Sequence, residues 1–326
     1  MSPVRVRRES WPFAQPFAIS RGSRTAVDVV VVELHRDGIV GRGECVPYPR
    51  YGESVDGVMD QVEALAPAIE QGLDNQDLQQ ALSPGAARNG LDCALWDWRA
   101  KATSEPAWRL AGCSAPGPLV TAFTLSLDSP EAMGLAAQKH SHRPLLKLKL
   151  AGQGDLERVA AVRQSAPNAR LIVDANEGWR PDQVEPFLAA LAEFDVALVE
   201  QPLPAGQDQV LAQLARPVPV CADESCHISD NLERLCPCYE AVNIKLDKSG
   251  GLTEALRLQS KARSLGLDIM VGCMVGTSLA MAPALLLAGN ADYVDLDGPL
   301  LLGRDRAQAL HYEGSVVQPP QSALWG

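Results

Sequence analysis

The stretch Leu145-Leu-Lys-Leu-Lys-Leu150 decides how the rest of the chain is interpreted. Its residues alternate with the period of two that is typical of a β-strand, so Lys147 and Lys149 share one face and the leucines share the other. An isolated strand of this kind is most often an exposed edge strand with its lysines in solvent. If the leucines instead pack against helices, as in a barrel, both lysines point into the barrel interior.

Short apolar runs alternate with helical stretches on both sides of this strand. Eight such runs follow residue 118, at 121–127, 145–150, 171–176, 197–202, 218–223, 241–246, 268–274 and 293–298. This alternation predicts a parallel sheet, and eight strands favour closure into a β/α barrel of the TIM type over an open sheet. No Gly-x-Gly-x-x-Gly or phosphate-loop motif follows an early strand, which removes the main argument for a nucleotide-binding open sheet. We therefore expect an α/β protein built on a β/α barrel.

The segment before residue 118 combines its elements differently. Its first 50 residues carry β-type runs, notably Val27-Asp-Val-Val-Val-Val-Glu-Leu34, and then a Gly/Pro-rich stretch at 41–49 that predicts turns. Two helical patterns follow, at 54–71 and 86–101. We predict three parts: a small α+β domain at 1–117, the barrel at 118–304, and a segment at 305–326 that returns to pack on the α+β domain.

Composition and charge exclude several classes of function. The 326 residues carry a formal net charge of −11, which argues against a surface built to neutralise nucleic-acid phosphates. No apolar run approaches the roughly 20 residues that span a bilayer, so we expect no membrane insertion. The start of the chain lacks the apolar stretch and cleavage site of a secretory signal, and the eight cysteines show no disulfide-type spacing. We therefore expect a cytoplasmic protein with reduced thiols.

Acidic residues recur at the ends of successive predicted strands. Asp174 and Asn176 end the third run, Glu200 ends the fourth 26 residues after Asp174, and Asp223 ends the fifth after another 23. Three carboxylates gathered at one barrel mouth, without a counter-charge close by in sequence, would repel one another unless a cation lay among them. Oxygen-only ligands suit a hard ion. We therefore predict one Mg²⁺ per subunit at Asp174, Glu200 and Asp223, with Mn²⁺ as a substitute.

Together these residues resemble the enolase superfamily, in its muconate-lactonizing subgroup. That subgroup carries Lys-x-Lys on the second barrel strand, metal carboxylates on strands three to five and a lysine on strand six, which matches Lys147, Lys149 and Lys245 here. The stretch Asn89-Gly-Leu-Asp-Cys-Ala-Leu-Trp-Asp97 is also similar to a helix of the subgroup's capping domain, so residues 1–117 are expected to form that domain.

The resemblance implies an isomerase in which Lys149 and Lys245 act as bases on opposite faces of an ene-diolate. Magnesium and Lys147 would stabilise the negative charge of that intermediate. Positive charge from the ion and from Lys147 would also lower the pKa of a lysine base, so that it could act near neutral pH.

The eighth predicted strand supplies a further acidic pair. Tyr293-Val-Asp-Leu-Asp-Gly-Pro299 places Asp295 and Asp297 on one face at the barrel mouth. An inward pair with no metal of its own suits a substrate ammonium group. The motif is similar to the Asp-x-Asp of the superfamily's dipeptide epimerases, where it binds the peptide amino terminus. The same resemblance implies that Thr124 and Cys273 line the dipeptide backbone.

The segment Phe17-Ala-Ile-Ser-Arg-Gly-Ser-Arg-Thr25 resembles the mobile capping loop of these epimerases. In those that act on L-Ala-D/L-Glu, an arginine like Arg24 would meet the side-chain carboxylate of the glutamate, and Arg21 is the alternative. The implied activity is the interconversion of L-Ala-L-Glu and L-Ala-D-Glu in the degradation of murein peptides.

Other activities stay open within the subgroup: a dipeptide epimerase of other specificity, a racemase of N-acylated amino acids, or a cycloisomerase or dehydratase. Asp295 and Asp297 argue against N-acyl substrates, which carry no ammonium group. A barrel that only binds ligands would not need both lysines and all three carboxylates. The expected partner is a small dipeptide. A homo-oligomer is compatible with the sequence, which indicates no oligomeric state.

Overall fold

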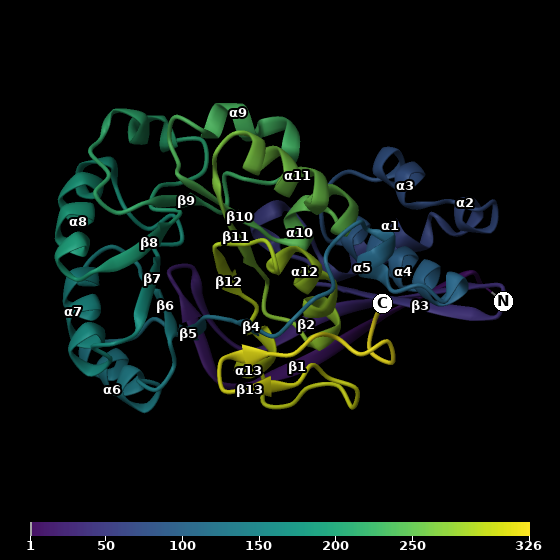
Figure 1. The fold of residues 1–326 in the computed structure, drawn as a ribbon, viewed down its shortest axis with the longest axis horizontal. Helices are drawn as coiled ribbons and strands as arrows, with labels where there is room; N and C mark the ends of the chain where they lie inside the picture. The colour runs from purple at the N-terminus through teal and green to yellow at the C-terminus, as the bar shows by residue number, and fades with distance from the viewer. Residues whose placement is uncertain (1) are drawn as a thin grey trace.

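The computed structural model describes residues 2–326 and contains an α+β capping domain beside a β/α barrel (Figure 1). In the capping domain, three strands form an antiparallel sheet and helices pack against it. The bounds are β1 Val4–Ile19, β2 Gly22–Arg36, β3 Ile39–Cys45, η1 Pro49–Tyr51, α1 Val55–Glu63, α2 Ala66–Glu70, α3 Asn75–Ala81, α4 Ala86–Thr103 and α5 Ala107–Leu110. The β1–β2 hairpin reaches across to the barrel, where the backbone N–H of Leu127 donates to Ala18.

Residues 41–45 belong to β3, although their glycines predict a turn. The prediction was wrong here because the glycines allow β3 to lie directly on α4. A Cβ atom on Gly43 would lie 2.1 Å from the carbonyl oxygen of Gly90, so that only glycine permits this approach.

The helical pattern at 54–71 forms two helices. The side chain of Ser54 caps α1 by accepting a hydrogen bond from the backbone of Gly57. Pro67 lies in the first turn of α2, and its missing N–H cannot continue the hydrogen bonds of α1. Helix α3, which Asp74 begins with a capping box, was not predicted from the sequence. The pattern at 86–101 is confirmed as α4.

The barrel contains eight parallel strands, each beside its neighbour in sequence. The backbone N–H of Ala122 donates to the carbonyl of Val294 at 2.8 Å, which joins the last strand to the first. The predicted eight-stranded barrel with an α+β capping domain is confirmed. The strand bounds are β5 Phe123–Leu125, β6 Leu145–Lys149, β7 Arg170–Asp174, β8 Val196–Glu200, β9 Val220–Ala222, β10 Ala241–Ile244, β11 Asp268–Gly272 and β12 Tyr293–Asp295.

Helices cover the outside of the barrel, with α6, α7 and α8 forming one flank in Figure 1. The connection between β8 and β9 departs from regular alternation, because its described residues form only the 3-10 turn η2 Asp208–Gln213. The other bounds are α6 Pro130–Lys139, α7 Asp155–Ser165, α8 Pro181–Glu193, η3 Ser229–Asn231, α9 Leu232–Leu235, α10 Leu246–Ser249, α11 Leu252–Ser264, α12 Ser278–Ala288 and α13 Gly298–Leu301.

One layer of the barrel interior is filled by a single side chain from each strand or from the residue just before it. This inner ring is Ala122, Leu145, Ile172, Leu198, Cys221, Ala241, Met270 and Tyr293. Residues two apart in a strand point to the same side. The next inward position on every strand therefore lies one layer nearer to the carboxyl ends, where barrel enzymes carry their active sites.

The end of the chain contacts the capping domain. The indole N–H of Trp325 donates to the carbonyl of Cys93 in α4, and the C-terminus lies beside the capping-domain helices in Figure 1. Before it, β14 Val316–Val317 pairs with β13 Tyr312–Glu313 on one side and with β4 Leu119–Val120 on the other. The domain boundaries at 117 and 304 stay predictions. Within residues 2–326, no helix has the length and apolar character needed to cross a membrane.

Candidate active site

The layer above the inner ring carries polar side chains on seven of the eight strands. Each stands two residues after a ring residue: Thr124, Lys147, Asp174, Glu200, Asp223, Asn243 and Asp295, with Gly272 in the eighth place. All seven are buried. The period of two that makes Lys147 an inward residue in the LLKLKL stretch therefore repeats around the whole barrel.

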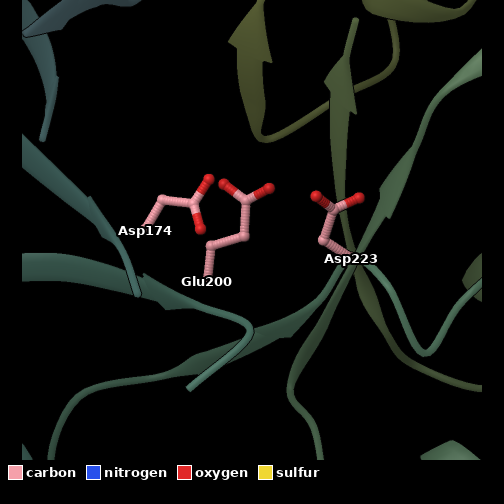
Figure 2. Close-up of side chains that lie close together, drawn as sticks. All are labelled: Asp174, Glu200 and Asp223. Atoms are coloured by element: carbon pink, nitrogen blue, oxygen red, sulfur yellow. The ribbon is translucent and has the colours of Figure 1, made fainter. Parts of the chain in front are cut away.

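Three carboxylates of this layer lie side by side at the barrel mouth (Figure 2). One oxygen from each of Asp174, Glu200 and Asp223 lies within 4.8 Å of the others. Strand register explains this, because Asp174 pairs with Glu200 across β7 and β8. Buried carboxylate oxygens at this spacing fit a hard divalent cation such as Mg²⁺. Oε2 of Glu200 lies 2.5 Å from Nζ of Lys147, so the group that contacts this oxygen is itself a cation, as the fit requires.

Lysine ammonium groups contact all three carboxylates. The Nζ–oxygen distances are 2.6 Å for Lys149 and Asp174, 2.5 Å for Lys147 and Glu200, and 2.6 Å for Lys245 and Asp223. No counter-charge lies close to the carboxylates in sequence, but the fold brings three lysines to them in space. The barrel places β6 and β10 on either side of β7, β8 and β9, so residues distant in sequence neutralise one another.

The carboxylates differ in their tendency to bind a proton. Burial would raise the pKa of Asp174, but Lys149 and Lys147 lower it to about 2. Burial and the neighbouring Asp174 instead raise the pKa of Glu200 to about 7. Of these two ligand candidates, Glu200 accepts a proton the more readily.

Lys147 and Lys245 hold their protons strongly, because neighbouring carboxylates raise the pKa of each well above its ordinary value. Burial by itself lowers the pKa of Lys245, but Asp223 and Glu200 outweigh it and raise the pKa well above its ordinary value. The sequence predicts the opposite direction for a lysine base. The difference arises because the carboxylates touch the lysine directly, whereas the predicted lowering assumes a metal cation among them.

A cavity of about 470 Å³ opens between the barrel mouth and the capping domain. Most of the residues predicted for the site line it: Arg24, Thr124, Lys149, Asp223, Lys245, Cys273, Asp295 and Asp297. The remaining three, Lys147, Asp174 and Glu200, are buried against these lining residues. The structure therefore brings all of the predicted site residues to one place.

Lys149 and Lys245 face this cavity from opposite sides of the barrel. Lys149 ends β6 and Lys245 follows β10, and three strands separate β6 from β10 in either direction around the barrel. A planar group held between them would meet one ammonium group on each face. This geometry suits removal of a proton from one face and its replacement on the other.

Asp295 and Asp297 present acceptor oxygens at the same mouth. Oδ2 of Asp297 accepts a hydrogen bond from the backbone of Thr124 at 2.6 Å. Oδ2 of Asp295 accepts one from Lys147 at 2.7 Å, and no described group donates to its Oδ1. Burial and the neighbouring Asp295 raise the pKa of Asp297 to about 7. The pair is therefore suited to a cationic or hydrogen-bond-donating ligand group.

Two arginines near the β1–β2 turn line the cavity, and only one is engaged by acids. Arg21 donates to Glu224 at 2.9 Å and lies 3.3 Å from Glu177. Arg24 forms no ion pair with any described carboxylate, and its guanidinium lies 5.9 Å from the ring centre of Tyr48. A carboxylate entering the cavity would therefore find an uncompensated positive charge at Arg24.

Two further residues of the site, Glu224 and Asn243, were not predicted from the sequence. Glu224 lines the cavity with one oxygen free of any described donor, and burial raises its pKa to about 7. Asn243 donates to Glu200 at 2.7 Å, in space left by Gly272, where a Cβ atom would lie 2.6 Å from Oδ1 of Asn243. Asn243 could have been predicted from the sequence, because it lies two residues before Lys245 and so shares its strand face.

Comparison with known proteins gives two family matches that together span most of the chain. Residues 132–322 match the domain described as "Enolase C-terminal domain-like". Residues 1–112 match the "Mandelate racemase / muconate lactonizing enzyme, N-terminal domain".

Individual relatives match over nearly their full lengths. The chain is 47% identical to the L-Ala-D/L-Glu epimerase of Escherichia coli K12, over 96% of this chain and 98% of the relative. It is 45% identical to an N-acetyl-D-glutamate racemase of a Pseudoalteromonas species, over 91% and 95%. A solved structure from Agrobacterium tumefaciens is described as an enolase family member with homology to dipeptide epimerases, with bound sodium and L-Ala-L-Glu. Its TM-score is 0.98, at 50% identity and 99% coverage of both chains.

Proposed function

The chain belongs to the mandelate racemase/muconate lactonizing enzyme family of the enolase superfamily, and from this premise we propose that it is a magnesium-dependent epimerase that interconverts L-Ala-L-Glu and L-Ala-D-Glu. The observation that carries the proposal is the pair Lys149 and Lys245, which face one cavity from opposite sides of the barrel. Inversion at the glutamate α-carbon requires a proton to leave one face and another to arrive on the other. Dipeptides of this kind would come from the degradation of murein peptides.

Asp174, Glu200 and Asp223 would hold the magnesium ion, because their buried oxygens converge. When bound, the ion would supply positive charge beside the α-carboxylate of the substrate, where negative charge grows as the α-proton leaves. Enolase-superfamily sites as a group combine a Lys or His base with magnesium.

The lysines of this chain would divide the proton transfer between them. One of Lys149 and Lys245 would take the α-proton, and the other would donate a proton to the opposite face, to give the ene-diolate and then the epimer. Both now contact carboxylates, and both line the cavity, so each ammonium group has space to turn toward a substrate. Lys147 is buried among Asp174, Glu200 and Asp295 and would keep a fixed positive charge beneath the substrate carboxylate.

The two ends of the dipeptide would be recognised by opposite charges. Asp295 and Asp297 would accept hydrogen bonds from the ammonium group of alanine, while Thr124 and Cys273 line the same cavity beside the peptide backbone. Arg24 would pair with the side-chain carboxylate of glutamate, because Arg21 is already engaged by Glu177 and Glu224. Charge-assisted hydrogen bonds at both ends would select short peptides with a free amino terminus and an acidic second residue.

A second candidate is racemisation of N-acetylglutamate, which the 45% identity to the Pseudoalteromonas enzyme favours. Such a substrate keeps the glutamate end and replaces the ammonium group by an uncharged acyl group. Asp297 decides between the two, because an ionised carboxylate there favours an ammonium group. The raised pKa of Asp297 leaves part of its population protonated near pH 7, where it could donate to an acyl oxygen.

The proposal is tested by incubating the enzyme and Mg²⁺ in deuterated water with a panel of L-Ala dipeptides and with N-acetyl-L-glutamate. NMR then follows the loss of the α-proton signal and the appearance of the second epimer. We expect L-Ala-L-Glu to exchange and epimerise fastest. Exchange with N-acetylglutamate at a higher kcat/KM than with any dipeptide would replace the first candidate by the second.

A further inference from the structure

Lys248 is a buried lysine that lies behind the candidate metal site. Its side chain is 1% exposed, it does not line the main cavity, and it borders a separate smaller pocket. Its three donors have three acceptors: Nζ lies 2.5 Å from Oδ1 of Asp223, 2.5 Å from the carbonyl oxygen of Asp223 and 3.0 Å from the carbonyl oxygen of Asn243. A lysine ammonium has three donors, so all of them are used.

The contacts of Lys248 lie just beyond the last backbone pair between β9 and β10. The pairing of β9 with β10 consists of Cys221 with Ala241 and Ala222 with Val242, so Asp223 and Asn243 are the first residues beyond it. Lys248 bridges the carbonyls of these two residues. It therefore continues the connection between β9 and β10 beyond their last backbone pair, where Asn243 still pairs with Met270 of β11.

Asp223 is held by two lysines from the same short segment. Lys245 contacts Oδ2 from the cavity side, and Lys248 contacts Oδ1 from the buried side. Lys245 lines the cavity and can turn away from Asp223, whereas Lys248 is enclosed and anchored to two carbonyls. The contact with Lys248 therefore fixes which carboxylate oxygen faces the candidate metal site.

The capping domain fixes the short helix that carries Lys248. Asp247 accepts hydrogen bonds from the backbone of Val46 at 2.9 Å and from the side chain of Asn89 at 2.8 Å. Arg88 donates to the carbonyls of Ser249 at 2.7 Å and Gly250 at 3.1 Å. The seating of the capping domain is thereby connected through α10 to a carboxylate of the site.

We propose that Lys248 is a positioning residue that orients Asp223 for the divalent cation. The inference rests on the metal site of the proposed function. It predicts that removal of Lys248 weakens cation binding. Loss of the charge alone would have the opposite effect, because removal of a positive charge close to a cation site by itself strengthens cation binding. Weaker binding by a folded variant that lacks Lys248 is therefore the result expected from lost orientation of Asp223.

The test is a Mn²⁺ titration followed by calorimetry and by electron paramagnetic resonance, with Mn²⁺ replacing Mg²⁺. Lys248→Met keeps the length of the side chain without its charge, and Lys248→Gln keeps a donor. Lys261→Met is the matched control, since Lys261 forms a surface ion pair with Glu233. We expect Lys248→Met to weaken Mn²⁺ binding by about 10- to 100-fold, the usual cost of losing an outer contact of a metal ligand. The Mn²⁺ concentration for half-maximal turnover should rise by the same factor, and Lys261→Met should change neither value.

The wild-type titration separates this inference from the proposed function. Absence of Mn²⁺ binding by the wild type would overturn the metal site, and the inference with it. If folded Lys248→Met binds Mn²⁺ within twofold as tightly as the wild type, or more tightly, only the inference is overturned. Failure of both Lys248 variants to fold would also overturn it, because the lysine would then serve the fold rather than the site.

Discussion

The ammonium nitrogen of Lys245 lies 2.6 Å from Oδ2 of Asp223, so a proposed base and a proposed metal ligand are in direct contact. The contact neutralises Asp223, whose pKa burial would raise but Lys245 and Lys248 hold well below its ordinary value. A divalent cation bound by Asp223 would compete with Lys245 for that oxygen. Metal binding and release of the base toward the substrate are therefore coupled in this site.

Removal of the metal should abolish turnover. We expect no epimerisation after exhaustive chelation and recovery when Mg²⁺ is added back. Asp174→Asn should lower kcat by at least about two orders of magnitude without loss of the fold, because the missing charge belongs to the ion site. Turnover and circular dichroism measure the two effects, and Asp182→Asn on the surface of α8 is the control. Full activity in the chelated enzyme would contradict the metal assignment.

Asp297→Asn should discriminate between free and N-acetylated ligands. The asparagine oxygen can still accept the hydrogen bond from the backbone of Thr124, so the loss is mainly one of charge. A charge-assisted hydrogen bond contributes about 1.5–3 kcal/mol, or roughly one to two decades of affinity. Binding of L-Ala-L-Glu should weaken by that factor, and binding of its N-acetyl derivative should change little. Equal losses for both ligands would show that Asp297 does not meet the amino terminus.

Arg24→Ala and Arg21→Ala should have different effects on specificity. Without Arg24, the preference for L-Ala-L-Glu over L-Ala-L-Leu should fall by about one to two decades in relative kcat/KM, because the side-chain carboxylate loses its cation. Arg21→Ala should slow both substrates to a similar degree, since Arg21 connects the turn to Asn176 and Glu224. Relative efficiencies unchanged in Arg24→Ala but altered in Arg21→Ala would exchange the roles of the two arginines.

The barrel and most of the site residues follow from the sequence because the signals are local. Period-two alternation sets which side chains face inward, and one strand-helix repeat separates Asp174 from Glu200 and Glu200 from Asp223. The contacts among the charges are not local. Lys147 and Asp295 are in contact although they are 148 residues apart. Lys248 lies in the short helix α10, so strand alternation does not indicate where its side chain points. Gly43 is a further example. In the sequence a glycine at this place indicates a turn, whereas in the structure it allows β3 to approach α4 closely.

Asp247→Asn should change how stability depends on pH. Burial raises the pKa of Asp247 from 3.8 to about 7, so between these values the folded protein binds a proton that the unfolded chain has released. The contribution of Asp247 to the free energy of unfolding is therefore largest below pH 4 and falls as the pH rises toward 7. Its upper bound is about 4 kcal/mol, at about 1.4 kcal/mol for each pKa unit.

The measurement compares urea unfolding of the wild type and of Asp247→Asn at pH 4.5 and pH 8. Asparagine carries no charge at either pH, so the stability of the variant relative to the wild type should increase with pH. Contributions from other titrating groups cancel in this difference. If the difference in the free energy of unfolding between the two proteins is the same at both pH values, the raised pKa of Asp247 is contradicted.

The final prediction concerns the two lysines, because two bases on opposite sides of a barrel leave a signature that one mobile base does not. Each direction of epimerisation needs one lysine as base and the other as acid, so Lys149→Ala and Lys245→Ala should each stop epimerisation in both directions. Lys139→Ala, on α6 outside the barrel, should change neither direction.

Exchange with solvent should survive selectively in these variants. In Lys149→Ala, the epimer whose α-proton faces Lys245 should still incorporate deuterium, because the proton can be removed and replaced on the same face. Lys245→Ala should exchange only the other epimer. NMR of each pure epimer in deuterated water, with Mg²⁺ present, separates exchange from inversion. If both variants exchanged the same epimer, or if either retained near-native epimerisation, one lysine would be only an electrostatic neighbour and the opposed positions of β6 and β10 would not be the basis of the reaction.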